Sequence, residues 1–206
     1  MVIDCLKNDN PLINQKLKEV TVEEGMAIAT KLFQILNKRG DGIGLASNQV
    51  GINAQVAVVN VREPIILINP KIIDQWEEVP YYEGCLSFPG QAIRTKRYRN
   101  IVVKSADVDC QYYFSAAGSP KGAKGSWEAS AKHDQEQRLL EAICVQHEID
   151  HLNGVTIHDR EKNLEPVKSE KKIGRNDLVT IKKGDAVKVL KYKKVQNLLN
   201  QGWVLE

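Results

Sequence analysis

CVQHEIDHLNG, residues 144–154, is the stretch around which this chain is organised. His147 and His151 are four residues apart, so on a helix their side chains project from one face, one turn apart. Two imidazoles at this spacing can bind one divalent metal ion, and Glu148 stands where a carboxylate reaches a water at the ion instead of the ion itself. The motif supplies only two protein ligands, so the third decides which chemistry the protein performs.

One long helix is predicted around this motif. Helical periodicity begins near residue 133, and the Asn-Gly pair at 153–154 is a normal helix stop. Leu140, Ile143 and Cys144 fall on the same stripe as the two histidines. The metal-binding face therefore continues an apolar surface that is directed at the core.

The composition is that of a globular protein. The chain has 206 residues, enough for one domain and a small appendage, with 42% hydrophobic and 27% charged residues. Residues 1–10 lack the basic start and apolar run of a signal peptide, and no apolar stretch approaches the roughly 20 residues that span a bilayer. We expect a cytoplasmic protein without membrane contact.

The charge is distributed unevenly along the chain. Residues 160–206 hold 12 Lys and Arg against 6 Asp and Glu, a net charge of +6, whereas the remainder holds 17 against 20, or −3. We predict a main domain over 1–160 and a basic C-terminal extension over 161–206. Residues 178–181 and 186–190 resemble two short strands around a turn, so the extension is expected to contain a β-hairpin.

Upstream of the motif, the chain predicts one helix and several strands. Thr21 is a suitable N-cap for a helix over residues 22–39 that ends at Gly40. Runs rich in Val and Ile predict strands over 55–61, 64–73, 76–82 and 100–109. The glycine-rich stretch at 40–52 predicts a tight turn, 83–90 an irregular segment, and 115–131 a flexible surface loop.

Two protease arrangements place a third ligand after such a motif. The metzincin pattern fits at Gly154, but its third ligand position holds Ile157, and His158 is one residue out of register. The thermolysin arrangement needs a glutamate on a later helix, but Glu165 and Glu170 lie in a lysine-rich stretch without an apolar face. A zincin-type metalloprotease is therefore an alternative without a convincing third ligand.

A cysteine is the remaining soft ligand. Cys5, Cys85, Cys110 and Cys144 form no Cys-x-x-Cys pair, and disulfides are not expected in a reducing compartment. Among them, Cys85 lies in a segment that is constrained by glycine and proline, which makes it the candidate.

Three segments together resemble the signature motifs of peptide deformylase, in the same order and at similar separations. They are GIGLASNQ at 42–49, EGCLS at 83–87 and QHEIDH at 146–151, within a resemblance that runs from about residue 3 to residue 159. The resemblance implies an α+β fold with mixed, largely antiparallel sheets packed around the central helix that carries HEIDH. It also implies a metal-dependent hydrolase that removes the formyl group from the N-terminal formylmethionine of newly made polypeptides and releases formate. Ser47 in place of an alanine and a longer segment over 107–138 depart from the family pattern.

Carried over to this sequence, the resemblance assigns a metal site. Cys85, His147 and His151 would bind one divalent metal ion and leave a fourth position for water. Fe(II) is the expected native metal, and Zn(II) or Ni(II) can replace it in isolated protein.

The resemblance also assigns catalytic and supporting roles. Glu148 would be the general base, while the side-chain amide of Gln49 and the backbone N–H of Leu86 would stabilise the oxyanion. Glu83 and Arg97 match a pair that braces the ligand segment.

The implied substrates are N-formylmethionyl peptides. A peptide would lie as an extended strand, hydrogen-bonded to Ile43 and Gly44 with Gly84 opposite. The methionine side chain would enter an apolar pocket with walls from Gly44, Tyr81, Leu140, Ile143 and Cys144.

The basic extension is not accounted for by the resemblance. Its lysines, with Tyr192 and Trp203, predict a contact with the ribosome or its RNA, against the alternative of an add-on whose lysines are only solvated. For the whole protein, the second alternative is an inactive binding protein on the deformylase fold. The compartment is expected to be a bacterial-type cytoplasm, and the altered ends are compatible with a viral enzyme that acts in a bacterial host.

Overall fold

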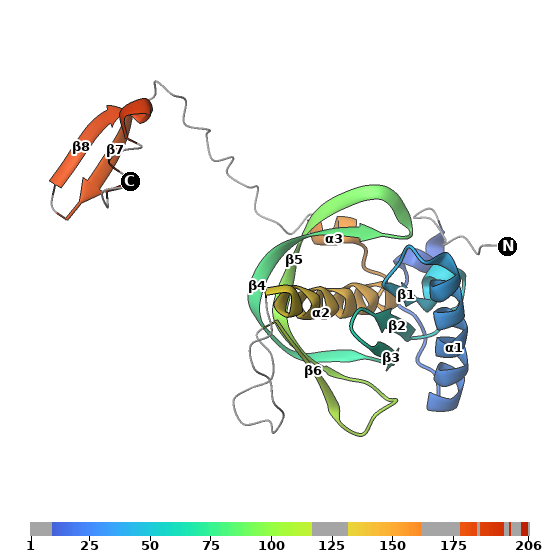
Figure 1. The fold of residues 1–206 in the computed structure, drawn as a ribbon. Coiled ribbons are helices and arrows are strands. Elements are labelled where there is room, and N and C mark those ends of the chain that lie inside the picture. Colours follow the sequence, from blue (N-terminus) through green and yellow to red (C-terminus); the bar gives the residue numbers. More distant parts are fainter. Residues whose placement is uncertain are drawn as a thin grey trace. The chain divides into compact units, whose positions relative to one another are not determined.

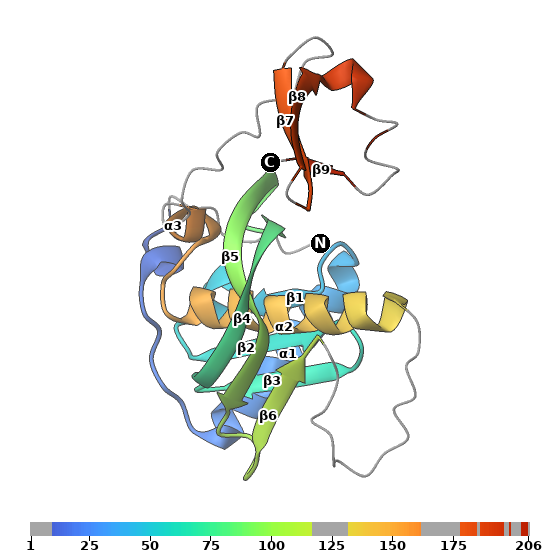
Figure 2. The same cartoon turned by 90° about the vertical axis from the view of Figure 1, so that its left-hand side faces the viewer.

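The structure is a computed structural model that describes residues 10–116, 132–161, 178–184, 186–195, 198 and 203–205. The chain divides into two compact units, Met1–Leu164 and Glu165–Glu206. In the larger unit, two three-stranded antiparallel sheets lie on either side of the helix that carries HEIDH (Figures 1 and 2). No helix in the described part of the chain is long and apolar enough to cross a membrane.

The predicted N-terminal helix is confirmed with the expected bounds. Helix α1 spans Val22–Arg39. Thr21 Oγ1 accepts a hydrogen bond from the Glu24 N–H at 3.2 Å, and Glu24 Oε2 accepts one from the Thr21 N–H at 3.0 Å. This reciprocal capping box starts the helix, and Gly40, with a φ of 74°, ends it.

The first sheet is buried on both faces. It consists of β1 (Gly44–Ala46), β2 (Val56–Asn60) and β3 (Pro64–Ile68) in that order. Along β2, Val56 and Val58 pack in the core cluster that includes residues of α1. Ala57 and Val59 point to the other face and pack in the cluster that includes residues of the HEIDH helix. Because both faces are covered, β2 is apolar from Val56 to Val59.

The second sheet is a long curved hairpin with a short third strand. Strands β4 (Lys71–Cys85) and β5 (Phe88–Lys104) pair along nearly their whole length, and β6 (Gln111–Ser115) adds to the other edge of β5. Leu86 and Ser87 form the turn between β4 and β5. Cys85 is therefore the last residue of an edge strand, directly before a tight turn.

Several sequence predictions for these strands are wrong in detail. The segment 83–90, predicted as irregular, continues β4 and begins β5, because edge positions tolerate the glycines and the proline. The predicted strand 64–73 is split at Asn69, whose φ is 48°. The strand predicted over 100–109 is the end of β5 and stops at Lys104. The stretch 40–52, predicted as a tight turn, contains β1 and a 3-10 helix.

Helix α2 (Lys132–Leu152) carries the motif and lies between the two sheets (Figures 1 and 2). Its buried residues, among them Ala142, Val145 and Ile149, share one core cluster with residues of both sheets. A short helix, α3 (Ile157–Glu161), follows the stop after α2. The predicted α+β class, with antiparallel sheets around the HEIDH helix, is confirmed.

The smaller unit contains the predicted hairpin. Strands β7 (Leu178–Lys183) and β8 (Ala186–Lys191) pair antiparallel, and β9 (Val204–Leu205) pairs with the other edge of β7. The loop predicted over 115–131 lies outside the described residues except for positions 115 and 116.

Candidate active site

The third ligand comes from the end of the second sheet. Cys85, His147 and His151 each offer one ligand atom, and these atoms lie within 4.8 Å of one another. Both histidines are on α2, whereas Cys85 ends β4, with its Sγ 3.2 Å from His151 Nε2. Ligand atoms gathered this closely are suited to bind one ion, whose bonds to them would be about 2.0–2.3 Å long. The donor set of one sulfur and two imidazoles fits a divalent metal ion.

The protease arrangement does not form in the described residues. His158, the histidine that was one residue out of register, packs edge-on against Phe88, with ring centroids 4.9 Å apart. It does not belong to the metal-ligand cluster. Residues 165 and 170 lie outside the described part of the chain.

A buried carboxylate orients the first histidine ligand. His147 Nδ1 lies 2.9 Å from Glu83 Oε2. Burial alone would raise the pKa of Glu83, but the hydrogen bonds from His147 and Arg97 outweigh it and lower the pKa to about 2. Because Glu83 is ionised, His147 Nδ1 donates the hydrogen bond, and Nε2 is left to bind metal.

The surroundings of the two histidines differ: burial, His147 and Arg97 lower the pKa of His151, whereas the surroundings of His147 favour a positive charge. Burial would lower the pKa of His147, but its hydrogen bonds to Cys85 and Glu83 and the nearby Glu148 carboxylate reverse this and raise the pKa. The acidic surroundings that favour a proton on His147 also favour a metal cation in its place.

The predicted pair of Glu83 and Arg97 is formed, and it extends further than predicted. Arg97 is 1% exposed, and its Nε and Nη2 donate to the two oxygens of Glu83 at 2.6 and 2.9 Å. Its Nη1 donates to Asp150 Oδ2 at 2.5 Å, and Asp150 also accepts from Arg160. Sequence reasoning missed Asp150 and Arg160. The signal that could have found Asp150 is an acidic residue between two metal ligands on a helix surrounded by core.

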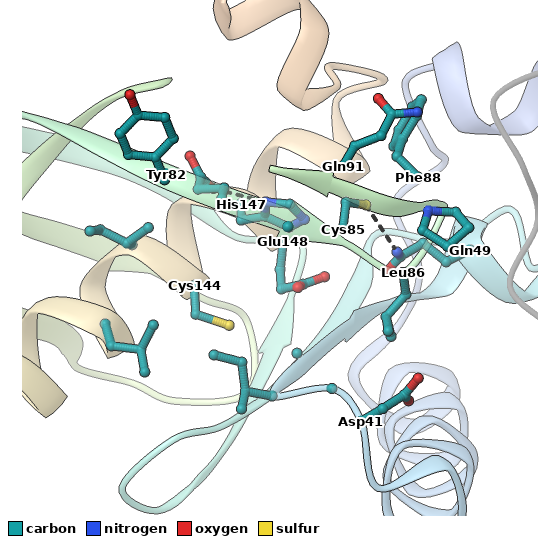
Figure 3. A pocket seen from close by; sticks show the side chains of 18 of the residues that line it. Asp41, Gln49, Tyr82, Cys85, Leu86, Phe88, Gln91, Cys144, His147 and Glu148 are labelled. Atoms are coloured by element: carbon teal, nitrogen blue, oxygen red, sulfur yellow. Dashed lines mark hydrogen bonds and ion pairs between the residues drawn. The ribbon is translucent and has the colours of Figure 1, made fainter. Parts of the chain in front are cut away.

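Glu148 is buried beside the ligands. It is 3% exposed, and its carboxylate points into the pocket in Figure 3. Its Oε2 has no hydrogen-bond partner among the described residues. Burial raises the pKa of Glu148 to about 7, against the attraction of His147. A buried carboxylate with one unpartnered oxygen is suited to proton transfer with a group that arrives with the substrate.

The amide of Gln49 is held in one orientation. Its Oε1 accepts from the Ala46 N–H at 2.9 Å, and its Nε2 donates to Ser87 Oγ at 3.3 Å. Nε2 also lies 3.7 Å from Cys85 Sγ, a contact drawn as a dashed line in Figure 3. Ser87, which no sequence pattern singled out, is buried in the turn two residues after the cysteine ligand.

A cavity of about 500 Å³ opens beside the metal-ligand residues. The seven residues predicted to bind substrate all line it: Ile43, Gly44, Tyr81, Gly84, Leu140, Ile143 and Cys144. Most other predicted site residues line it as well: Gln49, Glu83, Cys85, Leu86, His147 and Glu148. His151 and Arg97 are not among the lining residues, and both are buried. The rim includes Arg39, Asp41 and Tyr82, which sequence reasoning did not assign.

Comparisons with known proteins agree with this geometry. The family model described as polypeptide deformylase matches residues 3–167. The peptide deformylase of Dictyoglomus thermophilum is 35% identical over 175 residues, which cover 84% of this chain and 100% of that protein. The peptide deformylase of Heliobacterium modesticaldum is 33% identical over 172 residues, 80% of this chain and 97% of that protein.

Solved structures give the same result. The crystal structure of peptide deformylase from Thermotoga maritima is 27% identical and matches with a TM-score of 0.61 over 81% of this chain and 99% of that chain. A peptide deformylase from Synechococcus elongatus, solved in complex with actinonin, is 30% identical, with a TM-score of 0.59 over 78% of this chain and 79% of that chain. Since the family and its fold extend over most of this chain, the protein belongs to the polypeptide deformylase family and is a hydrolase that removes N-formyl groups from nascent peptides.

Proposed function

We propose that Cys85, His147 and His151 hold the one divalent metal ion of this deformylase and that Glu148 moves the protons of the reaction. One observation carries the proposal: a buried carboxylate with one oxygen unpartnered in the described chain lies at the pocket that Cys85 and His147 line (Figure 3), and the ligand atoms of these two residues converge with that of His151. When bound, the metal supplies a Lewis acid that polarises the formyl oxygen and lowers the pKa of water.

Glu148 has the proton-transfer role in this proposal. It accepts a proton from water as the new bond to the formyl carbon forms. It then passes the proton to the leaving nitrogen as the amide bond breaks. The products are formate and a peptide with a free amino terminus.

The oxyanion donors are the Gln49 amide and the backbone N–H of Leu86. Ala46 anchors Gln49 Oε1 and Ser87 takes one N–H, so the Gln49 amide cannot flip without losing both contacts. Its nitrogen faces the cysteine ligand at the pocket, where the formyl oxygen would gain charge. A donor fixed in advance costs no reorganisation during the reaction.

Gln49→Glu is expected to lower turnover on the order of a hundredfold, because a carboxylate repels the developing oxyanion. The measurement is kcat on formyl-Met-Ala-Ser, with metal content determined in the same samples. Gln55→Glu is the matched control, since Gln55 is buried but donates to Leu17 O at 3.2 Å, outside the residues that line the pocket. Near-wild-type turnover in metal-loaded Gln49→Glu would contradict the assignment.

We propose that the substrate binds as an extended strand between β1 and β4. Both are edge strands of their sheets, and both line the pocket. Ile43 and Gly44 would contribute backbone hydrogen bonds on one side and Gly84 on the other. Such binding recognises main chain and so accepts many sequences, while Tyr81 and the apolar face of α2 select methionine.

Fe(II) is the proposed native metal, a preference that rests on the family resemblance, because the donor set also accommodates Zn(II) and Ni(II). Protein prepared without oxygen and reconstituted with Fe(II) is expected to show a higher kcat/KM on formyl-Met-Ala-Ser than the Zn(II) form. Metal analysis of both samples makes the comparison per bound ion. Equal activity of the two forms would remove the reason for choosing iron.

We also propose that the basic extension, residues 161–206, contacts ribosomal RNA in a bacterial-type cytoplasm. The described lysines of the hairpin and the following turn are all exposed: Lys182, Lys183, Lys188, Lys191, Lys193 and Lys194. Lys188 Nζ also lies 4.6 Å from the Trp203 ring centroid. Clustered lysines bind phosphate through an electrostatic attraction that salt weakens.

Lys182→Glu combined with Lys191→Glu is expected to weaken co-sedimentation of the full chain with ribosomes. The slope of log affinity against log salt should fall by about 1 for each lost phosphate contact. Lys16→Glu combined with Lys18→Glu makes the same charge change at exposed positions of the larger unit and should have little effect. Equal binding by both double variants would rule out the proposed contact.

A further inference from the structure

A continuous series of hydrogen bonds and ion pairs runs from the metal-ligand residues to α3. Its members, in order, are His147, Glu83, Arg97, Asp150 and Arg160. The three middle members are buried, whereas the side chain of Arg160 is 41% exposed. The series therefore connects a metal ligand in the interior to a helix on the outside of the same unit.

With His147 neutral, as a metal ligand must be, the charges in this series balance only when Arg160 is included. Glu83 and Asp150 are two buried carboxylates, and Arg97 is a single buried cation. Arg160 supplies the second positive charge, since its Nε donates to Asp150 Oδ2 at 2.8 Å and its Nη2 donates to Oδ1. A buried carboxylate that loses its cation is strongly destabilising.

The hydrogen bonds of Arg97 link the charge on Asp150 to the histidine ligand His147. Arg97 directs its Nε and Nη2 at Glu83 and only Nη1 at Asp150. If Arg160 were absent, Asp150 would compete with Glu83 for the same guanidinium. A weaker two-point contact between Arg97 and Glu83 would loosen the carboxylate that orients the His147 ring.

We propose that Arg160 is a positioning residue for the metal centre: by binding Asp150 with two hydrogen bonds, it keeps Arg97 on Glu83 and so fixes His147. The inference rests on the ligand set proposed above. It makes α3 part of the metal centre, although no residue of α3 lines the pocket.

The variant Arg160→Met tests this without removing α3. Thr156 N and Oγ1 donate to Asp159 Oδ2 at 3.0 and 2.8 Å, and Ile157 is buried, so the helix keeps other anchors. Arg160→Lys retains the charge but cannot form the two-point contact. Arg62→Met is the matched control, because Arg62 pairs with Asp134 and Glu141 on the first half of α2, at 3.8 and 3.7 Å.

The experiment measures the rate at which the full-length Zn(II)-loaded protein loses its metal to an excess of chelator. Arg160→Met is expected to lose zinc on the order of tenfold faster than wild type, with Arg160→Lys between them and Arg62→Met at the wild-type rate. A second readout is the NMR signal of the His147 Nδ1 proton in the Zn(II) form. This proton should exchange with solvent faster in Arg160→Met and at the wild-type rate in Arg62→Met.

The outcomes separate this inference from the proposed ligand set. If Cys85→Ser binds zinc as tightly as wild type, the ligand set itself is wrong, and the inference falls with it. If Cys85→Ser loses zinc but Arg160→Met matches wild type in both zinc loss and proton exchange, only the inference is overturned. Faster zinc loss in Arg62→Met, equal to that of Arg160→Met, would also overturn it, since any lost ion pair on α2 would then have the effect.

Discussion

Glu148→Gln is expected to lower kcat by about 10²–10⁴-fold, the range that a positioned general base contributes. The change keeps the size of the side chain and replaces the carboxylate with an uncharged amide that cannot act as a base. Glu148 is buried, and its Oε2 lacks a partner in the described chain, so few structural contacts are lost. The measurement is kcat on formyl-Met-Ala-Ser at saturating substrate.

Metal content distinguishes a base from a ligand. The convergent ligand atoms come from Cys85, His147 and His151, so Glu148→Gln should retain its metal ion. Glu141→Gln is the matched control, because Glu141 is a buried glutamate on the same helix that pairs with Arg62 and does not line the pocket. Loss of metal in Glu148→Gln would make the residue a ligand, and unchanged kcat would remove it from the chemistry.

Features set by neighbouring residues could be predicted from the sequence. Helix α1 has its N-cap at Thr21 and its stop at Gly40, and both lie next to the helix that they delimit. The spacing of His147 and His151 is likewise a property of one helix, α2. Such signals depend on a few adjacent residues, so they can be recognised without knowledge of the fold.

Features set by distant residues could not be predicted in the same way. The segment 83–90 contains glycine and proline, which locally disfavour a strand, but pairing with β5 and an edge position override that preference. Cys85 was assigned as a ligand through the family resemblance and not through spacing. Asp150 and Arg160 belong to the site because Asp150 binds Arg97, a residue more than fifty positions away in the chain. No local sequence pattern encodes the contact between Asp150 and Arg97.

Gly44→Ala is expected to lower kcat/KM on the order of a hundredfold in metal-loaded enzyme. A Cβ at this position would lie 2.4 Å from Glu148 Oε1 and 2.7 Å from Cys144 Sγ, so either the carboxylate or the pocket wall must move. Displacement of a reacting group by about 1 Å can cost this much in rate. The glycine is thus required by close approach to a side chain on α2, not by an unusual φ angle.

A comparable clash elsewhere in the molecule separates this effect from a general loss of stability. In Gly25→Ala, the added Cβ would lie 2.7 Å from Ile68 Cδ1, in the contact between α1 and the first sheet, far along the chain from the ligands. Both variants should be less stable than wild type, because both overpack the interior. Only Gly44→Ala should lose activity per folded, metal-loaded molecule. If Gly25→Ala lost activity to the same degree, or if Gly44→Ala kept it, the pocket wall at Gly44 would not be what positions Glu148.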